Sequence, residues 1–433
     1  MYMKLKKKNL IFIVISMMLI TAAAGIYFYK SMFNRTISSP MLNTSNRDEK
    51  WISDLKFVKK ELPKKHKNLF FSKSKTEFYN QMDSLIGKVS KCNDMEIKGE
   101  LIKIISSIND SHTRVDIQED SSYPVSFFQF DDGVYVVDSS LKYKELWGKK
   151  LTSVNGYSMT QVQEKIDPFI SKDNKAIIKN QFCTLLRSVE MLKIAGITKE
   201  DNIVLNFEGY PNSVNVQPIK KSDYKNVKFL SDNTEYNKKF PISKQKQDKN
   251  YWFDYIQNSN LLYVKYNSCS NMPNYSFSQF TRDVFNTIDS KKVKTLVIDF
   301  SDNGGGNSKL FDNFLDEINK RNSINKKGNL FVIVGRKTFS SAILNSMDLR
   351  NSTKAILIGE PTGGKPNHFG EVKVIHLSNT NVNIYYSSNY FKTTDKETDS
   401  IYPDVNIPLK ASSYFNGKYD FLDYVLDKKI SSN

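Results

Sequence analysis

Between residues 294 and 358 the sequence repeats a pattern of apolar strand followed by amphipathic helix. Residues 294–300 (KTLVIDF), 329–334 (NLFVIV) and 355–358 (AILI) are short, predominantly apolar runs. The stretches between them carry apolar residues at helical spacing. Apolar strands that alternate with helices are typical of a parallel sheet covered on both faces. The sequence therefore predicts an α/β domain, in which functional sites gather at the carboxyl ends of the strands.

Two segments at those carboxyl ends carry candidate chemistry. Residues 301–307 (SDNGGGN) place three glycines after the first strand, so bare backbone N–H groups can approach an oxyanion. The loop lacks the GK[ST] ending of a phosphate-binding loop, which argues against nucleotide hydrolysis. Ser340 and Ser341 follow the second strand, where a hydroxyl would stand beside helix N-terminal amides. Taken alone, these features are more typical of a tight turn and a helix N-cap.

Composition excludes several other classes of protein. The 433 residues include only four His and three Cys, and Cys92, Cys183 and Cys269 are widely spaced with no CxxC pair. A zinc knuckle, an iron–sulfur site and a disulfide scaffold are therefore not expected, and no metal or organic cofactor is predicted. The formal charge of +17 is spread along the chain without an arginine-rich block, so we do not expect nucleic-acid binding.

The N-terminus predicts a membrane anchor. Several lysines between residues 4 and 8 precede an uncharged run over residues 10–29. Twenty helical residues span about 30 Å, the thickness of a bilayer core. The lysines should remain cytoplasmic, which places the rest of the chain in an extracytoplasmic space. The alternative is a secreted protein, because the small residues 22–25 (AAAG) could end a cleaved signal peptide.

The remaining patterns divide the chain into units. We expect a cytoplasmic tail and anchor (1–30), a polar tether (31–48), a helical N-terminal domain (49–120), a β-rich module (121–225) and the α/β domain (226–433). The helical domain is indicated by stripes such as Trp51, Leu55, Val58 and Leu62. In the β-rich module, Asn155–Gly156 after an alternating run predicts a hairpin turn.

Five short segments occur in an order that resembles the S41 serine peptidases, the family of the carboxyl-terminal processing (tail-specific) proteases and the tricorn protease core. They are DSHTRV (110–115), LVIDFSDNGGG (296–306), TFSSA (338–342), ILIGEPTGGK (356–365) and PDV (403–405). The similarity is strongest over about residues 255–410. It implies a crotonase- and ClpP-like catalytic domain within the α/β region. It also leaves open a PDZ-like fold for the β-rich module.

The resemblance assigns roles to individual residues. Ser340 matches the family nucleophile, and the oxyanion donors would be the amides of Gly305 or Gly306 and of Ser341. Gly304, Ser111 and His368 are expected to contact substrate. The chain departs from the family at Ile343, which stands where many members carry an acidic residue.

The general base has two candidates. One branch of the family uses a Ser–Lys dyad, and Lys365 stands at the position of that lysine. The tricorn-like branch uses a His at the position of His112, and Glu371 would then be the carboxylate that orients the ring. An imidazole titrates near neutral pH without help, whereas a lysine needs a strongly lowered pKa to act as a base. Both sets are present, so the sequence does not choose between them.

These expectations describe a membrane-anchored serine endopeptidase that cleaves loosely folded proteins or C-terminal tails. The alternative is a non-catalytic protein that binds peptides or apolar ligands on the same fold, as the retinoid-binding relatives do. The oligomeric state is not predicted.

Overall fold

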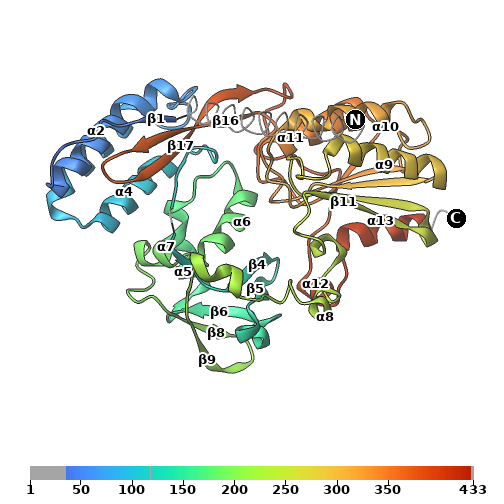
Figure 1. The fold of residues 1–433 in the computed structure, drawn as a ribbon, viewed down its shortest axis with the longest axis horizontal. Coiled ribbons are helices and arrows are strands. Elements are labelled where there is room, and N and C mark those ends of the chain that lie inside the picture. Colours follow the sequence, from blue (N-terminus) through green and yellow to red (C-terminus); the bar gives the residue numbers. More distant parts are fainter. Residues whose placement is uncertain (1–35, 118, 431–433) are drawn as a thin grey trace, which may run out of the picture.

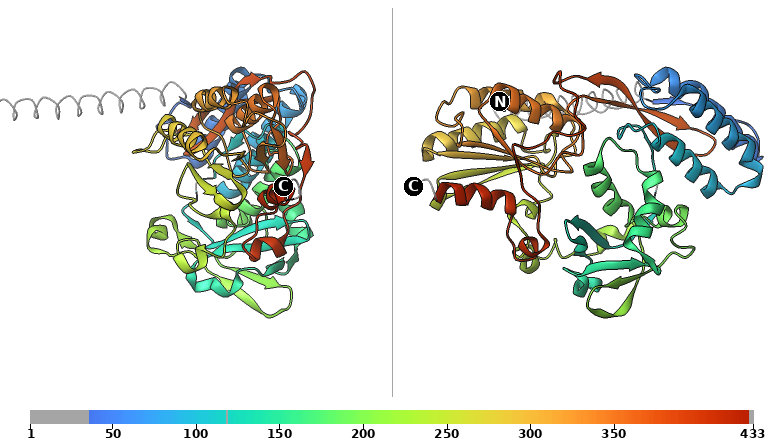
Figure 2. Two further views of the ribbon diagram at one scale, coloured as in Figure 1. Left: turned by 90° about the vertical axis from the view of Figure 1, so that its right-hand side faces the viewer. Right: turned by 180° about the vertical axis from the view of Figure 1, so that it is seen from behind.

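The computed structural model describes residues 36–117 and 119–430 and divides into three units that surround a central gap between ribbons (Figure 1). A helical unit, a β-rich unit and a sheet unit can be followed separately in the view from behind (Figure 2). The predicted anchor at residues 10–29 and the tail before it lie outside the described residues. Within the described ranges, no helix is long and apolar enough to cross a membrane.

The sheet unit confirms the predicted α/β pattern. Its six strands lie in the order β11-β12-β13-β14-β15-β18, and only β11 and β12 are antiparallel neighbours. The strands are β11 (Tyr251–Ile256), β12 (Leu261–Tyr266), β13 (Thr295–Asp299), β14 (Leu330–Val334), β15 (Ile356–Gly359) and β18 (Val405–Asn406). Every residue of β13 and β14 is buried, as their apolar sequences predict.

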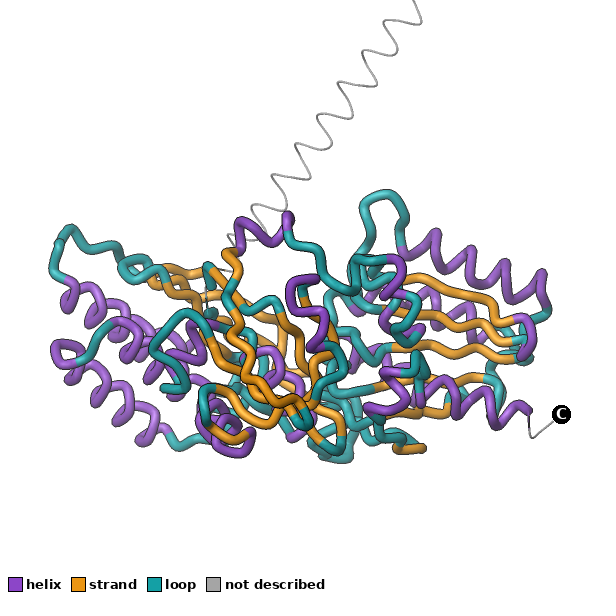
Figure 3. The backbone as a smooth tube through the Cα atoms, turned by 90° about the horizontal axis from the view of Figure 1, so that it is seen from below, coloured by secondary structure: helices purple, strands orange, loops and turns teal. Residues whose placement is uncertain are grey.

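Helices cover both faces of this sheet, as the view from below shows (Figure 3). On one face lie α9 (Phe277–Lys291), η7 (Ser308–Phe311), α10 (Asp312–Asn319) and α11 (Ser341–Ser352), which share one apolar core with the strands. On the other face, α13 (Asp420–Ile430) packs against Val297, Phe331 and Ile333 through a second core. The short helix α12 (Ala411–Phe415) precedes α13.

The helical unit forms where the apolar stripes were predicted. It contains α2 (Arg47–Lys65), α3 (Lys75–Lys88), η1 (Val89–Lys91) and α4 (Asp94–Ser106). Asn46, Ser74 and Asn93 cap the three α-helices by accepting hydrogen bonds from backbone amides, which fixes where each helix begins.

The core of the helical unit is completed by strands from the other end of the chain. A sheet in the order β1-β16-β17-β2 lies against the helices, and Ile375, Leu377 and Ile384 join their core. Its strands are β1 (Thr36–Ser38), β16 (His368–Leu377), β17 (Val382–Phe391) and β2 (Arg114–Val115). Two predictions change as a result. Residues 36–38 of the predicted tether form a strand, and the helical unit is not confined to residues 49–120.

The β-rich unit is a six-stranded sheet with helices against it. The strands in order are β4 (Val125–Phe130), β5 (Gly133–Ser139), β6 (Lys150–Val154), β8 (Ile203–Phe207) and β9 (Tyr210–Val216), and β7 (Tyr157–Ser158) pairs with β6. Asn155 and Gly156 both have positive φ and connect β6 to β7, which confirms the predicted turn. The helices are α5 (Met159–Ile166), α6 (Lys175–Leu185) and α7 (Val189–Ile194).

The segment from β9 to β11 joins the β-rich unit to the sheet unit and contains β10 (Ile219–Lys220), η4 (Lys221–Asn226), α8 (Thr234–Asn237) and η5 (Ile242–Lys244). The other short elements are β3 (Ser121–Ser122) before β4, η2 (Leu141–Leu146) and η3 (Asp167–Phe169) in the β-rich unit, and η6 (Gln257–Ser259) between β11 and β12. A direct contact is made by Arg336, which binds Glu360 through two hydrogen bonds and donates a third to the carbonyl of Gln129 in β4.

Asp54 ties the helical unit to the β16–β17 turn. Its carboxylate is fully buried in α2 and accepts hydrogen bonds from Ser39, from the Asn379 side chain and backbone, and from the Thr380 hydroxyl and backbone. We expect Asp54→Asn to lower the free energy of unfolding by about 2–4 kcal/mol, because an amide turned toward buried donors leaves them unsatisfied. Urea denaturation of both proteins measures the difference.

The matched control is Asp83→Asn on α3, which removes an ion pair at the surface with Lys59 of α2. Exposed pairs contribute less than about 1 kcal/mol, so this variant should unfold close to the parent. Equal losses from both substitutions would contradict the role of Asp54 as a buried anchor.

Candidate functional site

Ser340 occupies the sharp turn between β14 and α11. Its backbone has φ 53° and ψ −124°, a conformation that a residue with a side chain rarely adopts. Thr338 fixes the start of this turn to the end of β13: its hydroxyl donates a hydrogen bond to the carbonyl of Phe300 and accepts one from the amide of Gly335. The Ser340 hydroxyl has no hydrogen bond to another described residue. A serine exposed on a strained strand-to-helix turn is the arrangement of a nucleophile elbow.

The glycine loop lies directly against this turn. A Cβ atom added to Gly305 would stand 2.7 Å from Cβ of Ser340 and 3.0 Å from the amide nitrogen of Ser341, so no side chain fits there. Two hydrogen bonds hold the segments together: the Phe339 amide donates to the carbonyl of Asn303, and the Ser341 hydroxyl donates to the carbonyl of Gly306. The second bond occupies the Ser341 hydroxyl and leaves Ser340 as the free one.

The amides predicted to bind an oxyanion differ in availability. The Gly305 amide donates to Oδ1 of Asn303 at 2.9 Å, whereas the amides of Gly306 and Ser341 donate to no described residue. Gly304 is exposed, with open space where a side chain would be. Gly306 and Ser341 are therefore the available donors in this conformation, and Gly304 faces solvent.

A buried charge cluster supports the loop from the sheet side. Lys265 is fully buried and contacts Asp299 at 3.1 Å and Asp302 at 2.9 Å, and Lys244 binds both oxygens of Asp302 at 2.5 and 2.7 Å. Burial alone would raise the pKa of Asp302, but the two lysines hold it well below its ordinary value. Burial also lowers the pKa of Lys244 to about 8. The cluster fixes the residue from which the glycine loop begins.

His112 lies beside the nucleophile turn. Its side chain is buried, and the ring stacks on Phe339 with centroids 4.2 Å apart and on His368 at 5.6 Å. Neither ring nitrogen has a hydrogen-bond partner in the described part of the chain. Burial lowers the pKa of His112 to about 3, against an opposing effect of Asp110. The ring is therefore neutral near pH 7 and holds an unshared electron pair, which is the state a general base requires.

The other candidate base lies in a different electrostatic setting. Lys365 is about one quarter exposed, and its Nζ is 4.0 Å from Oδ1 of Asp173. Burial raises the pKa of Asp173 to about 6, although a hydrogen bond from Ser111 and the charge of Lys365 oppose the shift. Ser111 is thus bound to Asp173 rather than directed at His112. Lys365 thus lies beside a nearly buried carboxylate and is partly open to solvent.

Two further predicted residues have different outcomes. His368 is buried next to His112, and its Nδ1 lies 3.0 Å from the carbonyl of Lys365, so it belongs to the same cluster. Glu371 does not join it. The residue is exposed on β16 with φ 54°, and its backbone carbonyl accepts a hydrogen bond from the Ser388 hydroxyl. The carboxylate nearest to the His112 ring in the described structure is Asp110, at 3.9 Å from Nδ1.

Sequence reasoning missed three residues of this region. Asp110, Asp173 and Asn303 are buried or nearly so and bind other members of the cluster. Asp110 and Asn303 stand inside the motifs DSHTRV and SDNGGG, so their place in the motif was the available signal. Asp173 lies in the loop before α6, and no local pattern marks it.

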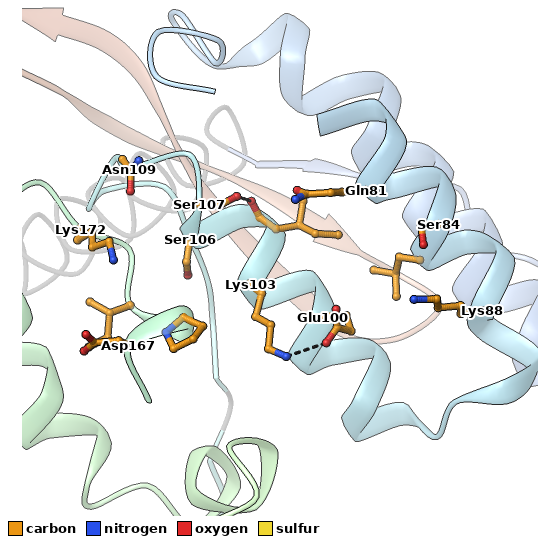
Figure 4. Close-up of a pocket in the computed structure, with 14 residues that line it drawn as sticks. Gln81, Ser84, Lys88, Glu100, Lys103, Ser106, Ser107, Asn109, Asp167 and Lys172 are labelled. Carbon is orange, nitrogen blue, oxygen red and sulfur yellow. Dashed lines mark hydrogen bonds and ion pairs between the residues drawn. The ribbon is translucent and has the colours of Figure 1, made fainter. Parts of the chain in front are cut away.

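A cavity of about 590 Å³ opens behind the His112 loop, between α3, α4 and residues 167–172 (Figure 4). Lys88, Lys103 and Lys172 line it, and Lys103 pairs with Glu100 at 2.8 Å. Asn109 also lines the cavity and directly precedes Asp110, and Lys172 directly precedes Asp173. Neither Ser340 nor His112 lines this cavity, so it adjoins the candidate site without containing it.

No protein-family description matches the sequence, and no curated protein does so either. Solved structures do match. Mature CPAF complexed with lactacystin aligns with a TM-score of 0.64 and 13% identity, over 89% of this chain and 98% of that one. Mature CPAF alone aligns with a TM-score of 0.62 and 12% identity, over 88% and 96% of the two chains. This chain has an S41-peptidase fold.

The S41 fold extends over the helical, β-rich and sheet units together, because the alignment covers nearly the whole chain. The family resemblance drawn from motif order is thus confirmed at the level of the fold. The comparison does not assign a PDZ type to the β-rich unit.

The lowered pKa of His112 predicts a specific acid sensitivity of the fold. In the unfolded chain the ring takes up a proton near pH 6.5, but in the folded chain it remains neutral until about pH 3. As the pH falls below 6.5 the unfolded state binds more protons, so stability falls. From pH 7.5 to pH 5, His112 should account for roughly 2 kcal/mol of that loss.

The test compares urea unfolding of the parent and His112→Phe at the two pH values. The variant should show the smaller loss on acidification. A parent-like dependence in His112→Phe would contradict the burial of a neutral ring.

Proposed function

We propose that this chain is a serine endopeptidase that cleaves polypeptides through an acyl-enzyme. The observation that carries the proposal is the strained Ser340 turn, with its hydroxyl unpartnered and with a buried neutral His112 stacked on the adjacent Phe339. A residue in strained backbone and a buried ring without hydrogen bonds both cost stability, and such costs gather at functional sites. The S41 fold supports the same activity.

In the proposed mechanism, Oγ of Ser340 attacks the scissile carbonyl while His112 accepts its proton. The oxyanion that forms receives hydrogen bonds from the amides of Gly306 and Ser341, which have no other acceptor in the described structure. His112 then transfers the proton to the leaving amine. Water, deprotonated by the same ring, releases the acyl group and restores Ser340.

The surroundings of the two candidate bases favour His112 over Lys365. Burial keeps the imidazole neutral, whereas Lys365 is partly exposed and faces Asp173. We assign Lys365 a structural part instead, since its backbone carbonyl lies 3.0 Å from Nδ1 of His368.

The substrates we propose are loosely folded proteins or their C-terminal tails, because the exposed Gly304 leaves open space beside the nucleophile loop for an extended chain. We also propose that residues 121–225 act as a PDZ-like unit and that residues 10–29 anchor the chain with its catalytic part extracytoplasmic. The anchor proposal rests on the lysines that precede the apolar run.

The direct test of the activity is cleavage of unfolded casein by the full chain, followed through new amino termini. Ser340→Ala should lower kcat/KM by at least about a thousandfold, since it removes the attacking atom. Ser341→Ala is the matched control on the same turn, and it should retain measurable cleavage. Cleavage that survives in Ser340→Ala would remove this nucleophile. A folded parent that cleaves nothing would favour the binding-protein alternative.

The choice of base is tested on the same substrate. We expect His112→Ala to lower kcat by about a thousandfold or more, because it deletes the proton acceptor. Lys365→Met keeps the length of the side chain and should cost less than about tenfold. The reverse order of these effects would identify Lys365 as the base. Circular dichroism spectra establish that both variants are folded.

A further inference from the structure

A general base in an acyl-transfer site needs a partner that fixes its ring, and the described structure shows none on His112. Both ring nitrogens are unpartnered among the described residues, and the predicted partner Glu371 is exposed on β16. The carboxylate at hand is Asp110, whose Oδ1 is 3.9 Å from Nδ1 of His112. A movement of the ring by about 1 Å would bring this pair to hydrogen-bond distance.

Asp110 is held in a way that leaves one oxygen turned to the ring. Its Oδ2 atom accepts three hydrogen bonds: from Nε2 of His66 at 2.9 Å, from the Thr113 hydroxyl at 2.6 Å and from the Ser387 hydroxyl at 2.6 Å. Its Oδ1 atom accepts only the backbone amide of His112 at 3.0 Å. A carboxylate oxygen has room for a second donor, so Oδ1 retains an acceptor site on the side of the His112 ring.

The tautomer of His66 follows from its own contacts. The backbone amide of Asn68 donates to Nδ1 of His66 at 3.1 Å, so in the neutral ring the proton is on Nε2, which faces Asp110. The His66 side chain is fully buried at the end of α2. Its N–H is thus a fixed donor that keeps Asp110 ionised and in place. Burial would raise the pKa of Asp110, but the hydrogen bonds from His66, Ser387 and Thr113 hold it below its usual range.

We propose that Asp110 and His66 are the positioning residues of the base: Asp110 fixes the His112 ring through Nδ1, and His66 fixes Asp110. The proposal rests on the proposed peptidase function for its chemistry. When the proton is on Nδ1 and directed at Asp110, the unshared electron pair of the neutral ring is on Nε2. This nitrogen is then the atom that accepts the proton of Ser340. The imidazolium that forms is stabilised by the anionic Asp110, which itself takes no proton.

The arrangement assigns the orienting carboxylate to the loop that carries the base. The structure puts Glu371 at the surface, whereas Asp110 joins α2, the His112 loop and β17 through buried hydrogen bonds. The base is thereby oriented by the helical unit and the β16–β17 hairpin, while the nucleophile belongs to the sheet unit.

The first experiment reads the ring tautomers without requiring activity. The full chain carrying Ser340→Ala is labelled with ¹⁵N-histidine, and long-range ¹H–¹⁵N spectra at pH 7 are assigned with the aid of the four single His substitutions. We expect His112 as the Nδ1–H tautomer and His66 as the Nε2–H tautomer. In Asp110→Asn, His112 should lose its preference for Nδ1–H, and in Glu371→Gln it should keep it. An Nε2–H tautomer of His112 in the parent overturns the proposal, whatever the activity of the chain.

The second experiment uses casein cleavage. Asp110→Asn should lower kcat by about a thousandfold or more with KM changed less than about threefold, because the wrong tautomer presents an N–H to the nucleophile. His66→Phe should lower kcat by about tenfold or more, and His66→Gln, which keeps a donor, should restore part of that loss. Glu371→Gln is the matched carboxylate control and should stay within about twofold of the parent. A large loss in Glu371→Gln with a small one in Asp110→Asn overturns the proposal.

Discussion

The site depends on a steric constraint at the carboxyl ends of four neighbouring strands, β12 to β15. The backbones there approach so closely that side chains are excluded: an added Cβ would stand 2.7 Å from Cβ of Ser340 at Gly305, 2.4 Å from the Cys269 carbonyl at Gly306 and 2.1 Å from the Val334 carbonyl at Gly359. All three glycines have positive φ, which residues with side chains rarely adopt. The close approach is what brings a row of amides to the turn that carries the serine hydroxyl.

Such a loop needs support, and the chain supplies it with buried charge. Two lysines and two aspartates are removed from water beneath the glycines, an arrangement that contributes little net stability compared with apolar packing. The ion pairs instead fix a position: Lys244 and Lys265 both bind the carboxylate of Asp302, and this holds the start of the glycine loop in place. The Asn303 side chain continues this support on the site side by binding the carbonyl of Tyr266 and the Gly305 amide.

Local patterns predicted the fold and part of the site. The buried strands, the helical stripes and the Asn155–Gly156 turn depend on residues that are close together in the sequence. The structure has all three where they were expected. Ser340, the glycine loop and His112 belong to short motifs. The supports of His112 could not be predicted, since His66, Asp110 and Ser387 come from three distant segments that only the tertiary fold brings together. Glu371 lies outside the cluster because it is exposed on β16 with φ 54°, and nothing in the local sequence signals a positive φ at a glutamate.

The β16–β17 hairpin has a consequence for the order of events during synthesis. The helices of residues 47–106 leave the ribosome first, but the strands that close their core are made last, more than 260 residues later along the chain. Until then the core that these helices share lacks its β16–β17 side, and the loop that bears the base has no β17 to pair with. A nascent chain therefore carries its serine and its histidine as separate, unassembled parts. The molecule acquires its reactive centre only when almost all of it exists.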